Sequence, residues 1–262
     1  FGADKDILYE AKPHVGTDVL RTVIVNIRKH LITSGVNVMF NTELIDFDDS
    51  TAKLLLYNKE EKQEYFDYLV LAVGHSATPI YELLKKKEVE LEPKNFAVGV
   101  RIEHLQSEIN NVQYHGHYEN LGAADYKLVA HVGNRSLYTF CMCPGGYVVN
   151  ASSEEGALVT NGMSNNKRDS LNANSALLVN VNVEDYYTGD VLDGVKFLKK
   201  YENLAYNKYG SFIAPVQLVG DFLKGKSSTK LGKVIPSIKP KYQLGTIEDI
   251  LPDFVVDTLK EG

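Results

Sequence analysis

Both cysteines of the chain lie in the stretch YTFCMCPGG at 138–146, two residues apart and directly before a Pro-Gly-Gly sequence. On an extended strand the Cα atoms of such a pair are ~6.6 Å apart, at the outer limit for a disulfide. A structural zinc site usually takes four ligands, and this chain has a single Cys-x-Cys. We therefore expect reduced thiols and no metal. The alternative is a zinc site completed by histidines from His104, His115, His117 and His131.

Alternation along this strand places the two sulfurs on one face and three larger side chains on the other: Tyr138, Phe140 and Met142. We expect the face with the aromatic rings to be the core face. The turn that follows has Pro at its second position and Gly at its third. Gly145 and Gly146 leave the backbone bare for a flat ligand, so we expect them to bind a cofactor. A tight hairpin turn without a ligand would explain the same glycines.

A second candidate is the sequence Arg101-Ile-Glu-His104, at the end of the strand-like run FAVGVRIEH. On a strand, Arg101 and Glu103 share a face and His104 points to the other. An arginine can hold a substrate carboxylate in a two-pronged contact, and a histidine can exchange a proton near neutral pH. We expect Arg101 and His104 to be catalytic. A structural Arg–Glu pair on the strand surface is the alternative.

The asparagine-rich stretch GMSNNKRDSLNANS at 162–175 is predicted to be a polar connection. Connections of this length are uncommon unless they are functional or disordered. We expect it to form the rim of a substrate site, with four substrate-binding residues: Arg168, Asn172, Asn174 and Ser175. Asparagines that cap the turns of the loop itself are the alternative explanation.

The last candidate is Gly74-His75-Ser76, which follows the apolar run 69–73. We expect this run to belong to a strand over 65–73 whose end is buried on both faces. Thr78 can cap the next helix, and Pro79 suits its first turn. Backbone N–H groups at such a junction can bind a phosphate, although a plain strand-to-helix connection has the same pattern.

Elements that would hold these residues can be read from hydrophobic periodicity. Strands are expected at 36–40 and in a hairpin on either side of the charged turn 58–64. Short strand-like runs between 95 and 183, separated by Gly, Asn and Pro, predict an antiparallel β-region. The predicted helices are 17–35, 80–87, 193–210 and two short C-terminal ones broken at Pro252.

Composition excludes several classes of protein. The chain has 262 residues, 44% hydrophobic and 24% charged, with a formal net charge of −6. A nucleic-acid surface needs clustered Lys and Arg, so we expect no nucleic-acid partner. No apolar run approaches the ~20 residues that span a bilayer. We therefore expect a cytoplasmic protein with a small-molecule substrate and no membrane partner.

Taken together, several unusual strings resemble the bacterial FAD-dependent dehydrogenases that are often labelled NAD(FAD)-utilising dehydrogenases. These are similar to the wider glutathione-reductase-like flavoprotein group. The strings spread over most of the chain and are PHVGTD (13–18), LAVGHSA (71–77), FAVGVRIEH (96–104), GAADYKL (122–128), FCMCPGG (140–146), NGMS (161–164) and RDSLNANSA (168–176).

The resemblance implies the layout of a longer protein. Family members begin with a Gly-rich strand-turn-helix that holds FAD, and no G-x-G-x-x-G occurs in this sequence. We therefore expect the central part of a flavoprotein, of mixed α+β and α/β class. The expected parts are a partial FAD-binding domain at 1–92, an inserted, mainly antiparallel β substrate-type domain at 93–235, and a return segment toward the FAD domain at 236–262.

By the same resemblance, the strand end Leu-Ala-Val-Gly at 71–74 lies near the cofactor, with Val73 in place of the usual threonine. Gly74, His75 and Ser76 would then contact FAD in the full-length protein, and this chain alone would bind FAD weakly or not at all. The function implied is an FAD-dependent oxidoreductase or dehydrogenase, with NAD(P)H as a second candidate partner. The alternative is a non-catalytic binding or regulatory module with a flavoprotein-like fold.

Overall fold

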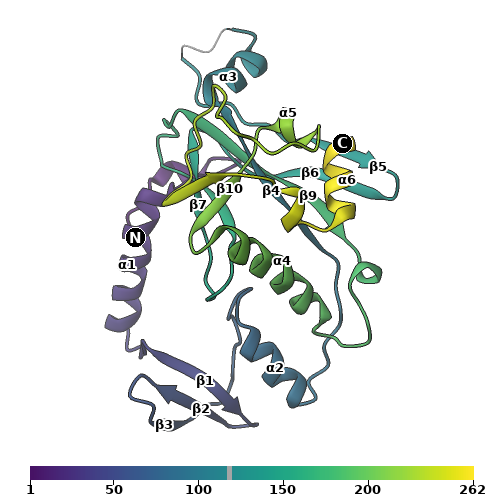
Figure 1. Ribbon diagram of the computed structural model, residues 1–262. Helices are drawn as coiled ribbons and strands as arrows, with labels where there is room; N and C mark the ends of the chain where they lie inside the picture. The colour runs from purple at the N-terminus through teal and green to yellow at the C-terminus, as the bar shows by residue number, and fades with distance from the viewer. Residues whose placement is uncertain (117–119) are drawn as a thin grey trace.

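The computed structural model describes residues 1–116 and 120–262 and has an α+β fold, as predicted (Figure 1). His117, one of the histidines of the zinc alternative, lies outside the described residues. The elements of the N-terminal part are η1 (Lys5–Leu8), α1 (Thr17–Thr33), β1 (Thr42–Phe47), β2 (Thr51–Leu56), β3 (Glu61–Tyr65) and α2 (Thr78–Lys86). The strands β1, β2 and β3 form a three-stranded antiparallel sheet.

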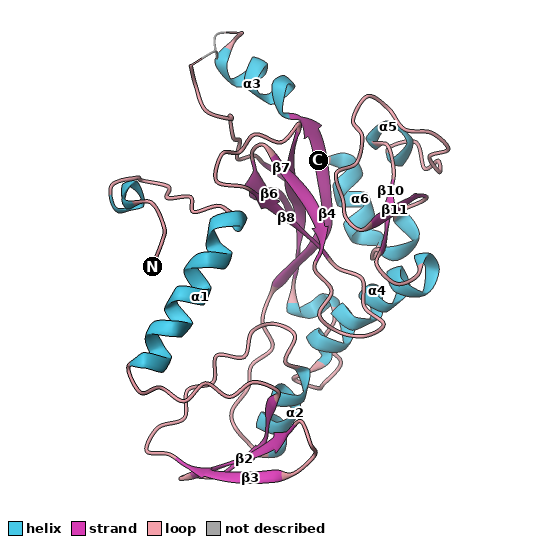
Figure 2. Ribbon diagram, turned by 90° about the vertical axis from the view of Figure 1, so that its left-hand side faces the viewer, coloured by secondary structure: helices cyan, strands magenta, loops and turns pink. Residues whose placement is uncertain are grey.

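Helix α1 has the predicted apolar stripe, yet none of its residues is buried. Ile24, in the middle of the stripe, is 55% exposed. Figure 2 shows α1 standing to one side of the rest of the chain. Its N-terminal end is tied to the loop after β8, because Thr17 donates to the Ser164 carbonyl at 3.2 Å and Asp18 accepts from the Asn166 N–H at 2.9 Å.

Two predicted strands of this part are wrong. Residues 36–40 and 66–73 are not strands. A hairpin does form after β2, but its second strand is β3, which occupies most of the predicted turn 58–64. The run predicted to be buried is open to solvent, with Tyr68 90% and Val70 83% exposed. A strand persists only where a neighbour satisfies its backbone hydrogen bonds. Neither segment belongs to a sheet of the described residues, and the Phe66 N–H, which donates to the Ser50 carbonyl at 3.0 Å, only extends the hairpin by one contact.

The second part is built on a four-stranded antiparallel sheet of order β4-β9-β6-β5, with β4 at one edge. The strands β7 and β8 form a separate antiparallel pair, and β10 and β11 a parallel one. The bounds are β4 (Phe96–Leu105), α3 (Gln106–Tyr114), β5 (Val129–Val132), β6 (Arg135–Cys143), β7 (Gly146–Asn150), β8 (Thr160–Ser164), β9 (Asn172–Val181), η2 (Val183–Asp185), α4 (Asp193–Tyr209), β10 (Ile213–Val216), α5 (Val219–Phe222), β11 (Lys241–Leu244), η3 (Glu248–Ile250) and α6 (Asp253–Glu261).

A hydrophobic core lies between this sheet and α6. It consists of Leu137 on β6, Val179 on β9, and Val255 and Leu259 on α6. Val179 and Val255 are completely buried. Burying such a side chain stabilises a fold by roughly 1.5–3 kcal/mol. Figure 2 shows α4 and α6 on the side of the sheet opposite α1. The two C-terminal helices predicted around Pro252 are confirmed as η3 and α6.

The prediction for the faces of β6 is wrong. Leu137, Thr139 and Cys143 are buried, whereas Phe140 is 61% exposed. The pairing with β9 is interrupted by an irregularity after Phe140, where Cys141 has a positive φ of 46°. A bulge of this kind redirects side chains. The two free thiols therefore do not share a face, since Cys141 is exposed and Cys143 is buried.

The prediction of a long polar connection at 162–175 is also wrong. Residues 162–164 belong to β8 and residues 172–175 to β9, so the loop is confined to 165–171. Asn174 and Ser175 are completely buried. Their small polar side chains fit inside the sheet because they are hydrogen-bonded there, a pattern that hydrophobic periodicity cannot distinguish from a loop.

Candidate functional site

Arg101 lies at the centre of a polar cluster on the edge strand β4. Its Nε donates to Asn174 Oδ1 at 3.0 Å, and its Nη2 donates to the Cys141 carbonyl at 2.8 Å. The Cys143 sulfur is 3.9 Å from the same nitrogen. Burial raises the pKa of the Cys143 thiol, and the charge of Arg101 opposes that shift. Within the described residues the guanidinium is therefore held by neutral acceptors and forms no ion pair.

Glu103 shares this face but does not pair with Arg101. Its carboxylate accepts hydrogen bonds from Asn172 Nδ2 at 3.0 Å, from the Ser237 N–H at 3.1 Å and from the Ser237 hydroxyl. The Arg–Glu pair considered as the alternative is thus absent from the described residues. Through these hydrogen bonds Glu103 connects β4 to β9 and to the segment before β11.

Gly162 on β8 permits the close packing of this cluster. A Cβ at residue 162 would overlap Asn174 Oδ1 and lie 2.5 Å from Arg101 Nη2. Asn174 Nδ2 is buried without a hydrogen-bond partner among the described residues. Arg101, Asn174 and Gly162 therefore form one packed unit, in which the hydrogen-bond donor Asn174 Nδ2 is unused among the described residues.

His104 points to the opposite face of β4, as predicted. Its Nε2 lies 2.9 Å from the Tyr126 hydroxyl, and the two rings meet edge to face. Burial lowers the pKa of His104, while Glu108 and Glu103 oppose the shift. Burial also raises the pKa of Tyr126. The two residues expected to be catalytic, Arg101 and His104, therefore lie on opposite faces of β4.

The Pro-Gly-Gly turn is packed against the chain itself. A Cβ on Gly145 would overlap the carbonyl of Arg168, and one on Gly146 would overlap the carbonyl of Met163. Gly145 N–H donates to the Gln106 side chain at 2.6 Å. The close approach that the glycines permit is thus made here by neighbouring backbone, and their contact with a cofactor stays a prediction.

Arg168 lies in the short loop that covers this turn. It has a positive φ of 51°, and its Nε is buried without a partner among the described residues. Asn172 is held by Glu103, and the Ser175 hydroxyl donates to the Phe140 carbonyl at 3.3 Å. The predicted substrate residues therefore gather around β9, and their role in substrate binding stays a prediction.

The turn Gly74-His75-Ser76 is open, in contrast. Gly74 has a φ of +77°, and a Cβ added there would meet no atom within 4 Å. His75 is exposed, and the Ser76 hydroxyl accepts from Ser153 at 2.6 Å. Helix α2 follows without a side-chain cap. A flat or anionic group could approach the backbone of this turn from solvent.

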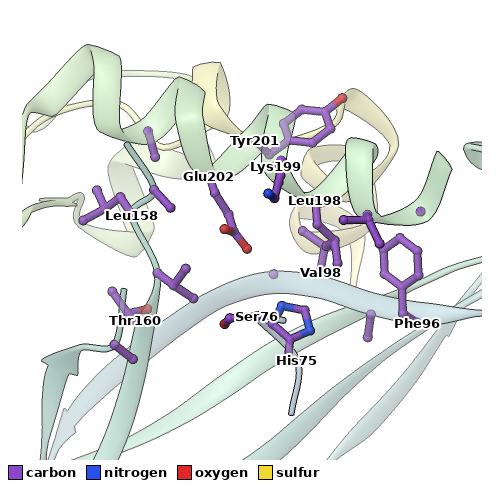
Figure 3. Close-up of a pocket in the computed structure, with 18 of the residues that line it drawn as sticks. His75, Ser76, Phe96, Val98, Leu158, Thr160, Leu198, Lys199, Tyr201 and Glu202 are labelled. Carbon is purple, nitrogen blue, oxygen red and sulfur yellow. The ribbon is translucent and has the colours of Figure 1, made fainter. Parts of the chain in front are cut away.

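A cavity of about 930 Å³ begins at this turn and follows the edge strand β4 under α4 (Figure 3). His75 and Ser76 stand at one side of it, and Arg101 and Glu103 belong to its lining. Most of the wall is apolar, with Val98, Leu158, Leu178, Val195, Leu198 and Ala205 among the lining residues. Its volume is within the range of small-molecule sites.

Glu202 of α4 points into the cavity toward the side of His75 and Ser76 (Figure 3). Burial raises the pKa of its carboxyl group, and the neighbouring His75 opposes the shift. The nearby Lys199 forms an ion pair with Glu154 at 2.9 Å. Sequence reasoning missed Glu202. The signal was available, because Glu202 follows Leu198 by four positions and so interrupts the apolar stripe of its helix.

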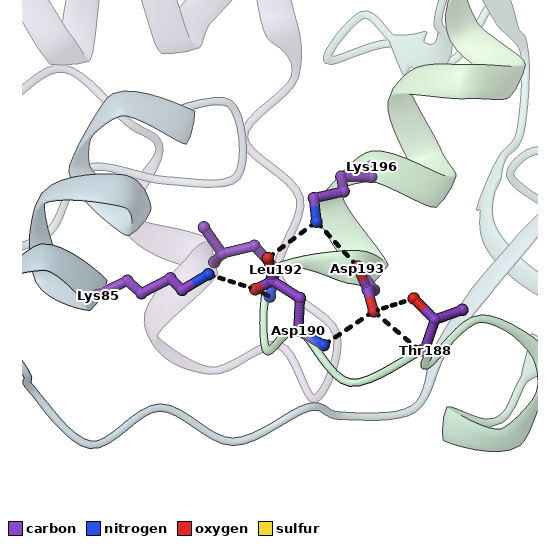
Figure 4. A network of polar contacts seen from close by, with 6 residues as sticks. All are labelled: Lys85, Thr188, Asp190, Leu192, Asp193 and Lys196. Atoms are coloured by element: carbon purple, nitrogen blue, oxygen red, sulfur yellow. Dashed lines mark hydrogen bonds and ion pairs between the residues drawn. The ribbon is translucent and has the colours of Figure 1, made fainter.

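An ion-pair network joins α2 to α4 (Figure 4). Asp190 accepts from Lys85 at 2.7 Å and from Lys196 at 2.9 Å. Asp193 accepts from Thr188 at 2.8 Å and from Lys196 at 3.0 Å. Hydrogen bonds from Lys85 and Lys196 lower the pKa values of Asp190 and Asp193, respectively.

Within residues 1–116 and 120–262, no group of three or more His, Cys, Asp and Glu side chains is arranged to hold a metal ion. The zinc alternative therefore has no ligand set in this part of the chain. No helix among the described residues is long and apolar enough to cross a membrane.

Comparison with known proteins supplies the family. Residues 95–262 match the family model described as FAD-dependent protein, C-terminal domain-like. An uncharacterized protein of Clostridium beijerinckii is 47% identical over 268 residues, which cover 100% of this chain and 50% of the relative. The chain therefore spans about half the length of this relative. Both the extent of the family match and this identity show that the chain belongs to the family of FAD-dependent proteins with this C-terminal-like domain.

Proposed function

We propose that the chain is the substrate-side part of a longer FAD-dependent oxidoreductase. The observation that carries the proposal is the course of the cavity, which runs from the open turn at His75 and Ser76 to Arg101 in a chain of an FAD-dependent family. FAD, when bound, supplies hydride or electron transfer, and the protein supplies binding and orientation. The cavity would hold the substrate beside it.

The turn at Gly74 is suited to lie against the cofactor. Its backbone is uncovered, and the space where a side chain would stand is empty. No G-x-G-x-x-G occurs in the sequence. In this proposal the phosphate-binding loop therefore belongs to the remainder of the longer protein, and Gly74, His75 and Ser76 contribute one wall of the site.

Exposed apolar surface on residues 1–92 supports the same arrangement. The stripe of α1 and the run 66–73 lie open, which is unfavourable for a soluble protein unless something covers them. We propose that the remainder of the longer protein packs on both. The run at 66–73 would then gain the strand neighbours that the sequence pattern predicts.

Among the described residues, Arg101 is well placed to hold an anionic group at its end of the cavity. It lines the cavity, it forms no ion pair with another described residue, and its position is fixed by Asn174 and the Cys141 carbonyl. A guanidinium so held binds a carboxylate without first losing side-chain freedom. His104 faces Tyr126 on the other side of β4, so its proposed role in proton transfer requires a separate opening there.

The test is a titration of FAD, followed by flavin fluorescence, with this chain and with a longer protein of the family that contains it. Quenching by the longer protein, with a dissociation constant raised at least tenfold for this chain, supports the proposal. A Gly74→Val variant of the longer protein should retain less FAD, whereas Gly35→Val, also at a positive φ in open space, should not. Absence of quenching by the longer protein overturns the proposal in favour of a non-catalytic binding module.

A further inference from the structure

Among the described residues, two carboxyl groups of the cavity lining are not used by the fold: Glu92, which is exposed, and Glu202, which is half-buried on α4. Within the described residues the Glu202 carboxylate forms no hydrogen bond or ion pair, whereas Glu154 is paired with Lys199 and Glu103 is held by Asn172 and Ser237. Partial burial without a partner disfavours the charged form of this carboxyl group. A cavity that retains such a group is therefore suited to a ligand that provides the missing partner.

The surroundings of Glu202 determine what that partner would be. Among its charged and titratable neighbours, Glu154 is neutralised by Lys199, and His75 stands across the cavity in an exposed turn. The wall also carries aromatic rings, from Phe96, Tyr81 and Tyr201. An ammonium group pairs with a carboxylate, and the mainly apolar wall favours an apolar body.

We propose that this cavity binds an apolar primary amine, whose ammonium group pairs with Glu202. The amine would be the substrate class of the proposed oxidoreductase, and in that respect the inference rests on the proposed function. Binding itself requires only the cavity. The ammonium group would stand at the Glu202 end, near His75 and Ser76, and the hydrocarbon part would extend along β4 past Val98.

The raised pKa of Glu202 in the empty cavity agrees with this geometry. Burial disfavours the charged form, and an ammonium group that enters would favour it again. Binding of the amine should therefore release a proton from Glu202 when the pH lies near the raised pKa. Binding of a neutral molecule of the same shape should not.

The experiment compares three probes of equal length on this chain by isothermal titration calorimetry: 4-phenylbutylamine, 4-phenylbutanol and 4-phenylbutanoate. We expect the amine to bind at least about tenfold more tightly than the alcohol, a difference of about 1.4 kcal/mol. Glu202→Gln, which keeps the size of the side chain, should reduce amine affinity to that of the alcohol. The matched Glu155→Gln change, at an exposed residue outside the cavity lining, should leave the preference intact.

Three results would overturn the inference: amine and alcohol affinities within twofold, no measurable binding of the amine, or an amine preference that survives in Glu202→Gln. Retention of FAD by the longer protein is measured separately, from its visible absorbance. If the longer protein retains FAD but the cavity shows no preference for the amine, the amine proposal is rejected and the proposal of an FAD-dependent oxidoreductase stands. If the cavity prefers the amine but the longer protein does not retain FAD, the proposed amine site stands and the proposal of an FAD-dependent oxidoreductase is rejected.

Discussion

Residues 1–92 and residues 95–262 both contain helices and strands but differ in what their apolar side chains contact. In the second region, Leu137, Val179 and Val255 meet in a closed core between a sheet and α6. In the first, α1 buries none of its residues, and Val70 lies almost fully in solvent. Both regions have secondary structure, yet only the second has a closed sheet-and-helix core of its own.

The difference shows that an amphipathic pattern predicts a helix with an apolar face but does not predict what packs against that face. Helices receive most of their stability from tertiary packing of the apolar face. A helix whose face is open thus depends on something outside the residues described. The four predictions that follow test this contrast, and they are ordered from the largest expected effect to the smallest.

The same substitution should have unequal effects in the two regions. Leu137→Ala leaves a cavity in the core and should lower the free energy of unfolding by about 2–5 kcal/mol. Leu31→Ala, on the open stripe of α1, should change it by less than about 0.5 kcal/mol. Urea denaturation of this chain measures both. Equal losses would contradict the contrast, and a larger effect of Leu31→Ala in the longer protein would show that α1 is covered there.

Packing around Arg101 should be nearly as sensitive as the core. Gly162→Ala forces a methyl group into Asn174 and Arg101, and we expect a loss of about 1–3 kcal/mol by denaturant unfolding. Gly122→Ala is the control, because a Cβ there meets no atom within 4 Å. If Gly162→Ala were tolerated as well as Gly122→Ala, the cluster would not be the rigid unit that the contacts describe.

The bridge between the two regions should add a smaller, pH-dependent contribution. Lys85 binds Asp190 and lowers its pKa, so the stabilisation is present above the usual Asp pKa of 3.8 and is lost as the pH falls below it. Asp190→Asn should therefore lower the melting temperature at pH 7, with a difference that shrinks toward pH 3. Melting curves across this range test it, with exposed Asp257→Asn as control. A difference independent of pH would exclude the ion pair as its cause.

The contribution of Glu202 to stability should depend on pH with the opposite sign. Because burial raises its pKa, ionisation costs stability once the pH rises through that value, and the cost is absent below the usual Glu pKa of 4.5. Glu202→Gln should thus slightly raise the melting temperature at pH 7 and have no effect near pH 4. The same melting curves decide, and a destabilising effect at pH 7 would mean that Glu202 has a partner in the fold.

Helices were predictable because their periodicity is local. The helices α1, α4 and α6 appear where the spacing of apolar residues placed them. Strands depend on neighbours that local sequence does not specify. The run 66–73 belongs to no sheet of the described residues and stays irregular. The polar residues Asn174, paired with β4 and β6, and Ser175, paired with β4, become the buried centre of a sheet.

The candidate site was predictable to a similar degree. Arg101 and the turn at His75 and Ser76 were identified from residue types, and the structure brings both to one cavity. The bulge at Cys141 could not be anticipated, since it depends on a positive φ at a non-glycine residue. Glu202 was missed because attention went to clustered polar residues, whereas the informative feature was one acid among apolar neighbours.

Strand β4 has a consequence for how sequences of this kind can diverge. Its neighbouring residues Glu103 and His104 serve opposite faces, the first toward Asn172 and Ser237 and the second toward Tyr126. The two side chains have different hydrogen-bond partners, so a substitution at one position leaves the hydrogen bonds of the other in place, while the charge of Glu103 still opposes the lowering of the His104 pKa by burial. Ligand preference in the cavity could therefore drift among relatives while the His104 face is retained, and a survey of natural variants should show the two positions changing independently.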